Sequence, residues 1–153
     1  MKKEKILISA CLVGENVRYD GGHNDISSDD FIQELLRDKL LISFCPEVEG
    51  GLETPRAPVE LINNRAITKT QEDKTVFFES GAKKTLELCK KYDIKYAILK
   101  FRSPSCGNGV IYDGTFTKTL VNGDGITTQL LKDNGIKVYS EQNLDELKKE
   151  LHK

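Results

Sequence analysis

The sequence predicts an α/β fold, in which an open and mainly parallel sheet is covered by helices on both faces. Short apolar runs typical of buried strands lie at about 5–12, 40–45, 95–101 and 136–140. Amphipathic segments typical of helices alternate with these runs, as in parallel sheets whose strands are joined by crossover helices. The length of 153 residues suits one domain. We therefore expect a single domain over residues 1–153 with a three-layer, Rossmann- or flavodoxin-like arrangement.

The first half of the chain contains clear local signals. A glycine-rich loop covers 13–24, and Ser27 or Ser28 is expected to cap a helix over about 29–38. The segment 46–58 contains three prolines and a Gly-Gly pair, so we expect no regular structure there.

The second half alternates helical patterns with turn signals. Short hairpins are expected within 59–70, around Asn63-Asn64, and near the Asp113-Gly114 turn. Helices are predicted over about 73–92 and 126–133. Asn143 is expected to cap a final helix whose apolar face carries Leu144, Leu147 and Leu151.

The composition limits the class of protein. Hydrophobic residues make up 38% and charged residues 31% of the chain, as in a globular domain. No apolar run approaches the roughly 20 residues that span a bilayer, and the start lacks a signal-peptide pattern. We therefore expect a cytoplasmic protein without membrane contact. The net charge of -1 argues against binding of bulk nucleic acid, and the sequence predicts no oligomeric state.

Three of the four cysteines stand at or just beyond the ends of predicted strands. Cys11 and Cys45 close the first two apolar runs, and Cys106 lies in the loop after the third. Because ligands of open α/β sheets bind outside the carboxyl ends of the strands, we expect these thiols to converge on one site. Cys89 differs, since it falls on the apolar face of a predicted helix and is expected to be a small buried hydrophobe.

Three converging thiols are compatible with several kinds of chemistry. Cysteines in a cytoplasmic protein favour metal binding or catalysis over disulfides. The sequence has no Cys-x-x-Cys pair, so the usual zinc-ribbon and thioredoxin spacings are missing. Zinc requires a fourth ligand, for which His23 is the candidate. Three cysteines on an iron–sulfur cluster would leave one iron open as a soft Lewis acid for a sulfur-containing ligand. A metal-free enzyme that forms a cysteine persulfide and a cluster-bearing sulfur sensor are the alternatives.

Several motifs, in order along the chain, resemble one known family. They are SACLVG at 9–14, VRYDGG at 17–22, CPE at 45–47, GGL at 50–52, PR at 55–56, SPSCG at 103–107 and YDGTF at 112–116. In these motifs, and over nearly its whole length, the sequence is similar to the thiouracil desulfidase family (TudS-like proteins).

This resemblance implies both a function and a site. Family members bind a [4Fe-4S] cluster through three cysteines, which match Cys11, Cys45 and Cys106, and leave one iron free for a thiocarbonyl sulfur. The implied reaction is a hydrolytic, non-redox desulfuration of thiouracil to uracil and sulfide. Glu47 matches a catalytic acidic residue, and Ser103 a catalytic serine. The implied substrate is a small thiolated pyrimidine as base, nucleoside or nucleotide, and a thiolated tRNA stays open as a larger one.

The residues themselves leave the narrower roles open. Glu47 lies two positions after Cys45, near enough to exchange a proton with water, although an ordinary surface glutamate has the same pattern. Ser103 is either a proton relay or a turn hydroxyl. Candidates for framing a substrate pocket are Arg18, Tyr19, Asp20, Arg56 and Ser105. In the alternative interpretation, Arg18 and Asp20 only brace their own loop.

Overall fold

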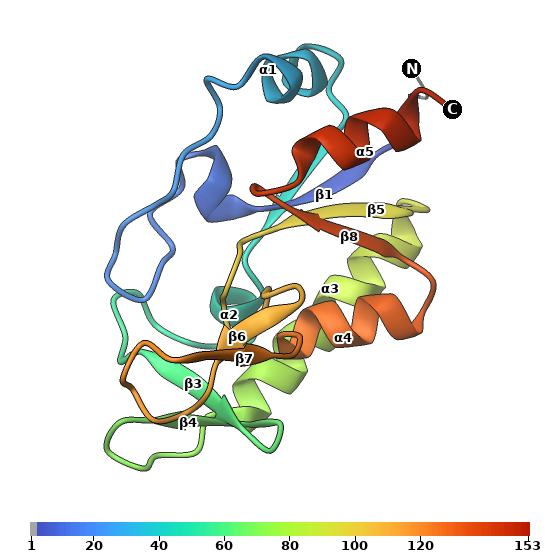
Figure 1. The fold of residues 1–153 in the computed structure, drawn as a ribbon. Coiled ribbons are helices and arrows are strands. Elements are labelled where there is room, and N and C mark those ends of the chain that lie inside the picture. Colours follow the sequence, from blue (N-terminus) through green and yellow to red (C-terminus); the bar gives the residue numbers. More distant parts are fainter. Residues whose placement is uncertain (1–2) are drawn as a thin grey trace.

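The computed structural model describes residues 3–153, so Met1 and Lys2 of the predicted domain lie outside the described residues. Within that part of the chain, four strands form a parallel sheet in the order β2-β1-β5-β8 (Figure 1). Their bounds are β1 Ile6–Ser9, β2 Leu41–Phe44, β5 Tyr96–Leu99 and β8 Lys137–Ser140. In register, Ile8 of β1 lies between Ser43 of β2 and Ile98 of β5. The predicted parallel sheet is confirmed.

Helices cover both faces of the sheet, as predicted. Their bounds are α1 Asp30–Arg37, α3 Thr75–Lys91, α4 Ile126–Asp133 and α5 Leu144–Leu151. In Figure 1, α1 and α5 lie on one face, whereas α3 and α4 lie on the other. Successive side chains of β1 alternate between these layers, so Ile6 and Ile8 pack with α1 and α5, and Leu7 packs with α3 and α4. No helix within residues 3–153 combines the length and apolar character needed to cross a bilayer.

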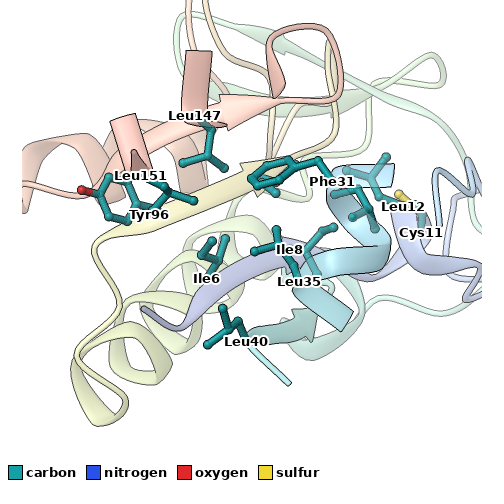
Figure 2. Packing of buried hydrophobic residues seen from close by; sticks show 12 residues of the cluster. Ile6, Ile8, Cys11, Leu12, Phe31, Leu35, Leu40, Tyr96, Leu147 and Leu151 are labelled. Atoms are coloured by element: carbon teal, nitrogen blue, oxygen red, sulfur yellow. The ribbon is translucent and has the colours of Figure 1, made fainter. Parts of the chain in front are cut away.

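One apolar cluster fills the space between the sheet and the pair α1 and α5 (Figure 2). The helices contribute Phe31, Ile32, Leu35, Leu147 and Leu151, all of them buried. Cys11 belongs to the same cluster and lies beside Leu12 at its edge in Figure 2. The packed core therefore fixes the position of this cysteine at the carboxyl end of β1.

Two cysteines stand where a strand passes directly into a helical turn. β1 ends at Ser9, earlier than predicted, and Cys11 lies in the following 3-10 turn, η1 (Ala10–Val13). Cys45 follows β2 and precedes a short helix, α2 (Pro46–Glu49), where irregular structure was expected. That expectation was wrong because a proline at the first helical position has the required φ and lacks only an N–H that the helix leaves unpaired there.

Two predicted helix caps differ from the structure. Asp29, rather than Ser27 or Ser28, caps α1, because its Oδ1 accepts hydrogen bonds from two first-turn N–H groups at 2.9 and 3.1 Å. Asn143 does precede α5, but its Oδ1 accepts the N–H of Ser140 at 2.7 Å and thereby fixes the end of β8. A neighbouring aspartate thus takes the place of the expected serine at α1, and α5 begins without a side-chain cap.

Antiparallel hairpins pack beside α3. Their strands are β3 Val59–Ile62 with β4 Arg65–Thr68, and β6 Val110–Tyr112 with β7 Leu120–Asn122. The first hairpin is as predicted: Asn63 and Asn64 adopt left-handed backbone at φ of 50° and 63°. The second is wider than the Asp113-Gly114 turn suggests, because residues 113–119 form a loop before β7 begins.

Candidate active site

The carboxyl ends of β1, β2 and β5 meet at one cavity. The strand order of the sheet reverses between β1 and β5, which is the place where open α/β sheets bind ligands. The cavity has a volume of about 500 Å³ and is lined by Cys11, Cys45 and Cys106. The structure thus brings together the three thiols that the sequence places at strand ends.

These three thiols share a poorly solvated space. Cys11 and Cys106 are buried, and Cys45 is half-buried. Burial, reinforced by the nearness of Cys106 and Cys45, raises the pKa of Cys11 to about 12. Burial also raises the pKa of Cys106 to about 11 and the pKa of Cys45. Thiolates in such a space require a cationic partner, as a bound metal centre provides.

Hydrogen-bond donors surround two of the sulfur atoms. The hydroxyls of Ser9 and Ser105 lie 3.6 and 3.5 Å from Sγ of Cys106. Backbone N–H groups of Val48 and Glu47, at the start of α2, oppose the burial that raises the pKa of Cys45. Donors of this kind stabilise sulfur that carries negative charge. The donor set therefore fits the iron–sulfur cluster that the sequence resemblance implies.

The other candidate ligands lie elsewhere. His23 is exposed, and its Nδ1 accepts the N–H of Asp25 at 3.2 Å. Cys89 is buried in the apolar cluster beneath α3 and α4, where burial raises its pKa to about 11. Among residues 3–153, no set of three or more His, Cys, Asp or Glu side chains is arranged to hold a single metal ion. The zinc hypothesis with His23 thus finds no support, and the position of Cys89 agrees with a packing role.

Glu47 lines the same cavity from the first turn of α2. Its Oε1 lies 3.3 Å from both Nε and Nη2 of Arg56, and the two side chains are only 16% and 8% exposed. Its Oε2 accepts hydrogen bonds from Oγ of Ser105 at 3.0 Å and of Ser103 at 3.5 Å. Both carboxylate oxygens are therefore fixed, which distinguishes Glu47 from an ordinary surface glutamate.

The two serines form a hydrogen-bonded chain with Glu47. Oγ of Ser103 accepts the backbone N–H groups of Ser105 and Cys106, each at 3.1 Å. The hydroxyl oxygens of Ser103 and Ser105 lie 3.0 Å apart, and either hydroxyl can donate to the other. Ser103 is consequently both a turn hydroxyl and a member of a chain that leads to the carboxylate.

The remaining predicted pocket residues divide into two groups. Arg18 and Tyr19 line the cavity, with the Arg18 guanidinium 5.7 Å from the centroid of the Tyr19 ring. Asp20 faces its own loop, where its Oδ2 lies 3.8 Å from Nη2 of Arg18. Arg56 lines the cavity, but its guanidinium binds Glu47 and the carbonyl oxygens of residues 17 and 53.

Comparisons with known proteins agree with this geometry. A family model described as 2-thiouracil desulfurase matches residues 6–143. The chain belongs to the 2-thiouracil desulfurase family. A solved structure of a [4Fe-4S]-dependent thiouracil desulfidase, TudS, is 45% identical with a TM-score of 0.95, covering 98% of this chain and 99% of that one. A Bacillus subtilis (strain 168) protein named uncharacterized protein YbbK is 39% identical over 152 residues, covering 93% of this chain and 99% of its own.

In this desulfurase-family protein, the cavity also contains residues that the sequence analysis did not single out. They include Glu60, Phe101, Arg102, Tyr112, Phe116 and Lys118. Their signals were of unequal strength: Phe101 and Arg102 directly precede the SPSCG motif, and Tyr112 and Phe116 belong to the YDGTF motif. Glu60 and Lys118 carry no sequence signal, because only tertiary folding brings their hairpins to the cavity.

Proposed function

We propose that the protein is a [4Fe-4S]-dependent thiouracil desulfidase that binds its cluster through Cys11, Cys45 and Cys106. The observation that carries this proposal is the cavity in which the three thiols share walls with the paired Glu47 and Ser105. Membership of the family and 45% identity to TudS support it. The four free thiols also suit a reducing compartment such as the cytoplasm.

The proposed reaction replaces the sulfur of a thiolated pyrimidine by oxygen. Thiouracil and water give uracil and hydrogen sulfide, so carbon and sulfur keep their oxidation states and no reductant is consumed. A cluster held by three cysteines supplies, when bound, an open iron that is a soft Lewis acid for the thiocarbonyl sulfur. The residues of the chain then orient the substrate, position water and move protons.

We assign Glu47 as the general base that activates the attacking water. Its carboxylate accepts a proton at Oε2 as the water oxygen attacks the carbon that carries sulfur. Arg56 holds Oε1 and is itself fixed by the backbone carbonyls of residues 17 and 53. Arg56 is therefore a positioning residue for the base, rather than the substrate contact that the sequence suggested.

The serine chain gives the accepted proton a route back into the cavity. Ser105 receives the proton from Oε2 of Glu47, to which its hydroxyl is bonded at 3.0 Å. Its own proton then passes to Ser103, whose hydroxyl proton reaches the departing sulfur. In this arrangement both serines act, Ser105 next to the carboxylate and Ser103 next to the substrate.

The walls of the cavity suit a flat heterocycle. Tyr19, Phe101, Tyr112 and Phe116 supply aromatic surface around it. Planar rings bind between such side chains through burial of their faces, while a few polar groups fix their orientation. A small thiolated pyrimidine is therefore the substrate class that we propose.

Anaerobic purification followed by iron and sulfide analysis and a thiouracil absorbance assay tests the proposal. The wild-type protein should hold about four irons per chain and consume thiouracil with release of uracil and sulfide. Cys106→Ala should lose both cluster and turnover. Cys89→Ala is the matched control, because it removes a buried thiol outside the cavity, and it should keep both.

Two results would contradict the proposal. A protein that reconstitutes with no iron, or that holds only zinc, would exclude the cluster mechanism. Activity that survives iron removal and depends on one cysteine alone would indicate the persulfide enzyme instead.

A further inference from the structure

One wall of the cavity belongs to residues 113–119, the loop between β6 and β7, which we call the wall loop. Phe116 and Lys118 of the wall loop line the cavity, and Tyr112 lines it from the end of β6. The thiols, Glu47 and the serine chain lie on other elements of the fold. The wall loop is therefore placed to contact the substrate without taking part in proton transfer.

The wall loop adopts a backbone conformation that its residues do not favour. Phe116 and Lys118 have left-handed backbone, at φ of 59° and 62°, which is strained for residues other than glycine. The strands on either side have three residues each, and their side chains are half-buried in β6 and exposed in β7. Short strands with little buried surface give weak support, so interactions from another element have to hold the loop.

Glu60 of β3 provides such an interaction. Its Oε1 accepts hydrogen bonds from the backbone N–H groups of Gly114 at 3.0 Å and of Phe116 at 3.1 Å. Hydrogen bonds to a carboxylate are about twice as strong as those between neutral groups. One side chain of the first hairpin thus fixes two backbone positions of the wall loop, including Phe116, one of the two strained residues that line the cavity.

Gly114 allows the two hairpins to approach closely enough for this contact. Its φ is 94°, and a Cβ atom at this position would lie 2.2 Å from Cγ1 of Ile62 on β3. Hydrogen bonds between Asp113 and Thr115 and along the hydroxyls of Thr115, Thr117 and Thr119 lie within the loop. They shape the wall loop, whereas Glu60 attaches it to the rest of the molecule.

We propose that Glu60 is a positioning residue for substrate binding: it holds the wall loop so that the Phe116 ring packs against the bound pyrimidine. This inference rests on the proposed desulfidase function. Loss of the Glu60 carboxylate releases Phe116 from the cavity wall, while the thiols and Glu47 keep their places. Substrate binding is then weakened and the chemical step is preserved, which separates KM from kcat.

Steady-state kinetics of Glu60→Ala and Glu60→Gln under anaerobic conditions test this division. Glu60→Ala should raise KM for thiouracil about tenfold, as expected for loss of hydrogen bonds to a charged group, and keep kcat within about twofold. Glu60→Gln should restore most of the affinity, because the amide oxygen still accepts both N–H groups. Glu87→Ala, which removes an exposed glutamate of α3, should match the wild type.

Limited trypsin digestion, with fragments identified by mass spectrometry, measures the loop itself. Cleavage after Lys118 should be faster in Glu60→Ala than in the wild type and in Glu60→Gln. Should Glu60→Ala fail to retain its cluster or its fold, Phe116→Ala tests the same wall and should raise KM alone.

The outcomes separate this proposal from the function on which it rests. Equal cleavage rates in all variants, an unchanged KM in Glu60→Ala despite faster cleavage, or a Gln variant that behaves like the Ala variant would each overturn the role of Glu60. If the wild-type protein leaves thiouracil intact, the desulfidase function fails, and the cleavage rates still decide whether Glu60 holds the wall loop.

Discussion

Arg102 shows how a single residue carries backbone strain at the cavity. Its φ of 64° is left-handed and turns the chain from β5 into the loop that contains Cys106. Such a conformation costs a residue other than glycine roughly 1–2 kcal/mol. The guanidinium lies 4.9 Å from the centroid of the Phe101 ring, and both residues line the cavity. The backbone conformation of Arg102 therefore destabilises the folded protein at a position whose side chain lines the cavity.

Replacing Arg102 by glycine should therefore stabilise the protein and weaken substrate binding. Glycine removes the left-handed strain but gains freedom in the unfolded chain, so the free energy of unfolding should rise by no more than about 1 kcal/mol. KM for thiouracil should increase, because the cavity loses a cationic side chain. Thermal denaturation and steady-state kinetics measure the two effects on the same sample.

Gln71→Gly is the matched control for Arg102→Gly. Gln71 is exposed and has a φ of 69°, but it lies in the turn that follows β4. The same relief of strain is expected there with an unchanged KM. A fall in stability in both variants would contradict the strain argument, and an unchanged KM in Arg102→Gly would contradict a role in substrate binding.

At the scale of elements, the contact between α2 and α3 fixes two parts of the site. A Cβ atom at Gly81 of α3 would lie 1.9 Å from the carbonyl oxygen of Pro46, and one at Gly50 would lie 2.1 Å from that of Phe77. The helices therefore approach through their backbones, which only glycine allows. Because α2 carries Glu47 and follows Cys45, the position of α3 determines where both groups stand.

Gly81→Ala should move α2 away from α3 and disturb the site as well as the core. Overpacking of this kind typically costs about 1–3 kcal/mol, and the displacement of Cys45 and Glu47 should reduce cluster content and kcat. Thermal denaturation, iron analysis and the thiouracil assay detect these changes. Lys83→Ala on an exposed position of α3 is the control. Full cluster content and activity in Gly81→Ala would show that α2 is not fixed through this contact.

The elements were predictable where the signal is local. Short apolar runs located the sheet strands, period-3.6 patterns located the long helices, and Asn63-Asn64 located the first hairpin. Pro46 was misinterpreted because proline interrupts a helix in its interior but is favoured at its first position. The two further prolines in 46–58 favoured the interpretation as an irregular segment. The extent of 113–119 was not predictable either, because Glu60 and Gly114 meet there across two hairpins.

At the scale of the whole molecule, the meeting of the three cysteines was predictable, because the carboxyl ends of adjacent parallel strands lie side by side. Cys11, Cys45 and Cys106 follow three strands that are adjacent in the sheet, so their approach follows from the α/β pattern alone. The contact of Glu60 with the wall loop and the contact of Arg56 with Glu47 depend on how loops fold over the carboxyl ends of these strands. No periodicity in the sequence records such contacts.

Two carboxylates outside the cavity join neighbouring elements of the fold. Asp73, before α3, bonds the hydroxyl and N–H of Thr75 and binds Arg65 of β4 at 2.6 Å, and these contacts lower its pKa to about 2. Glu150 of α5 binds Lys137 of β8 at 2.7 Å and Lys153 at 2.9 Å, which lowers its pKa to about 2 as well. One pair supports the first hairpin, and the other ties the last helix to the sheet.

Combining Asp73→Asn with Glu150→Gln should remove stability in a pH-dependent manner. In the unfolded chain these groups titrate near 3.8 and 4.5, above their values in the folded protein. The folded state therefore binds fewer protons, and the contribution of the carboxylates is fully present above about pH 5 and disappears as the pH falls towards about 2. Thermal denaturation followed by circular dichroism should show a melting-temperature gap between wild type and double variant that is widest near neutrality and closes in acid. Glu87→Gln, which removes a surface charge of α3 outside both ion pairs, serves as the control. A melting-temperature gap that widened on acidification would refute the assigned ion pairs.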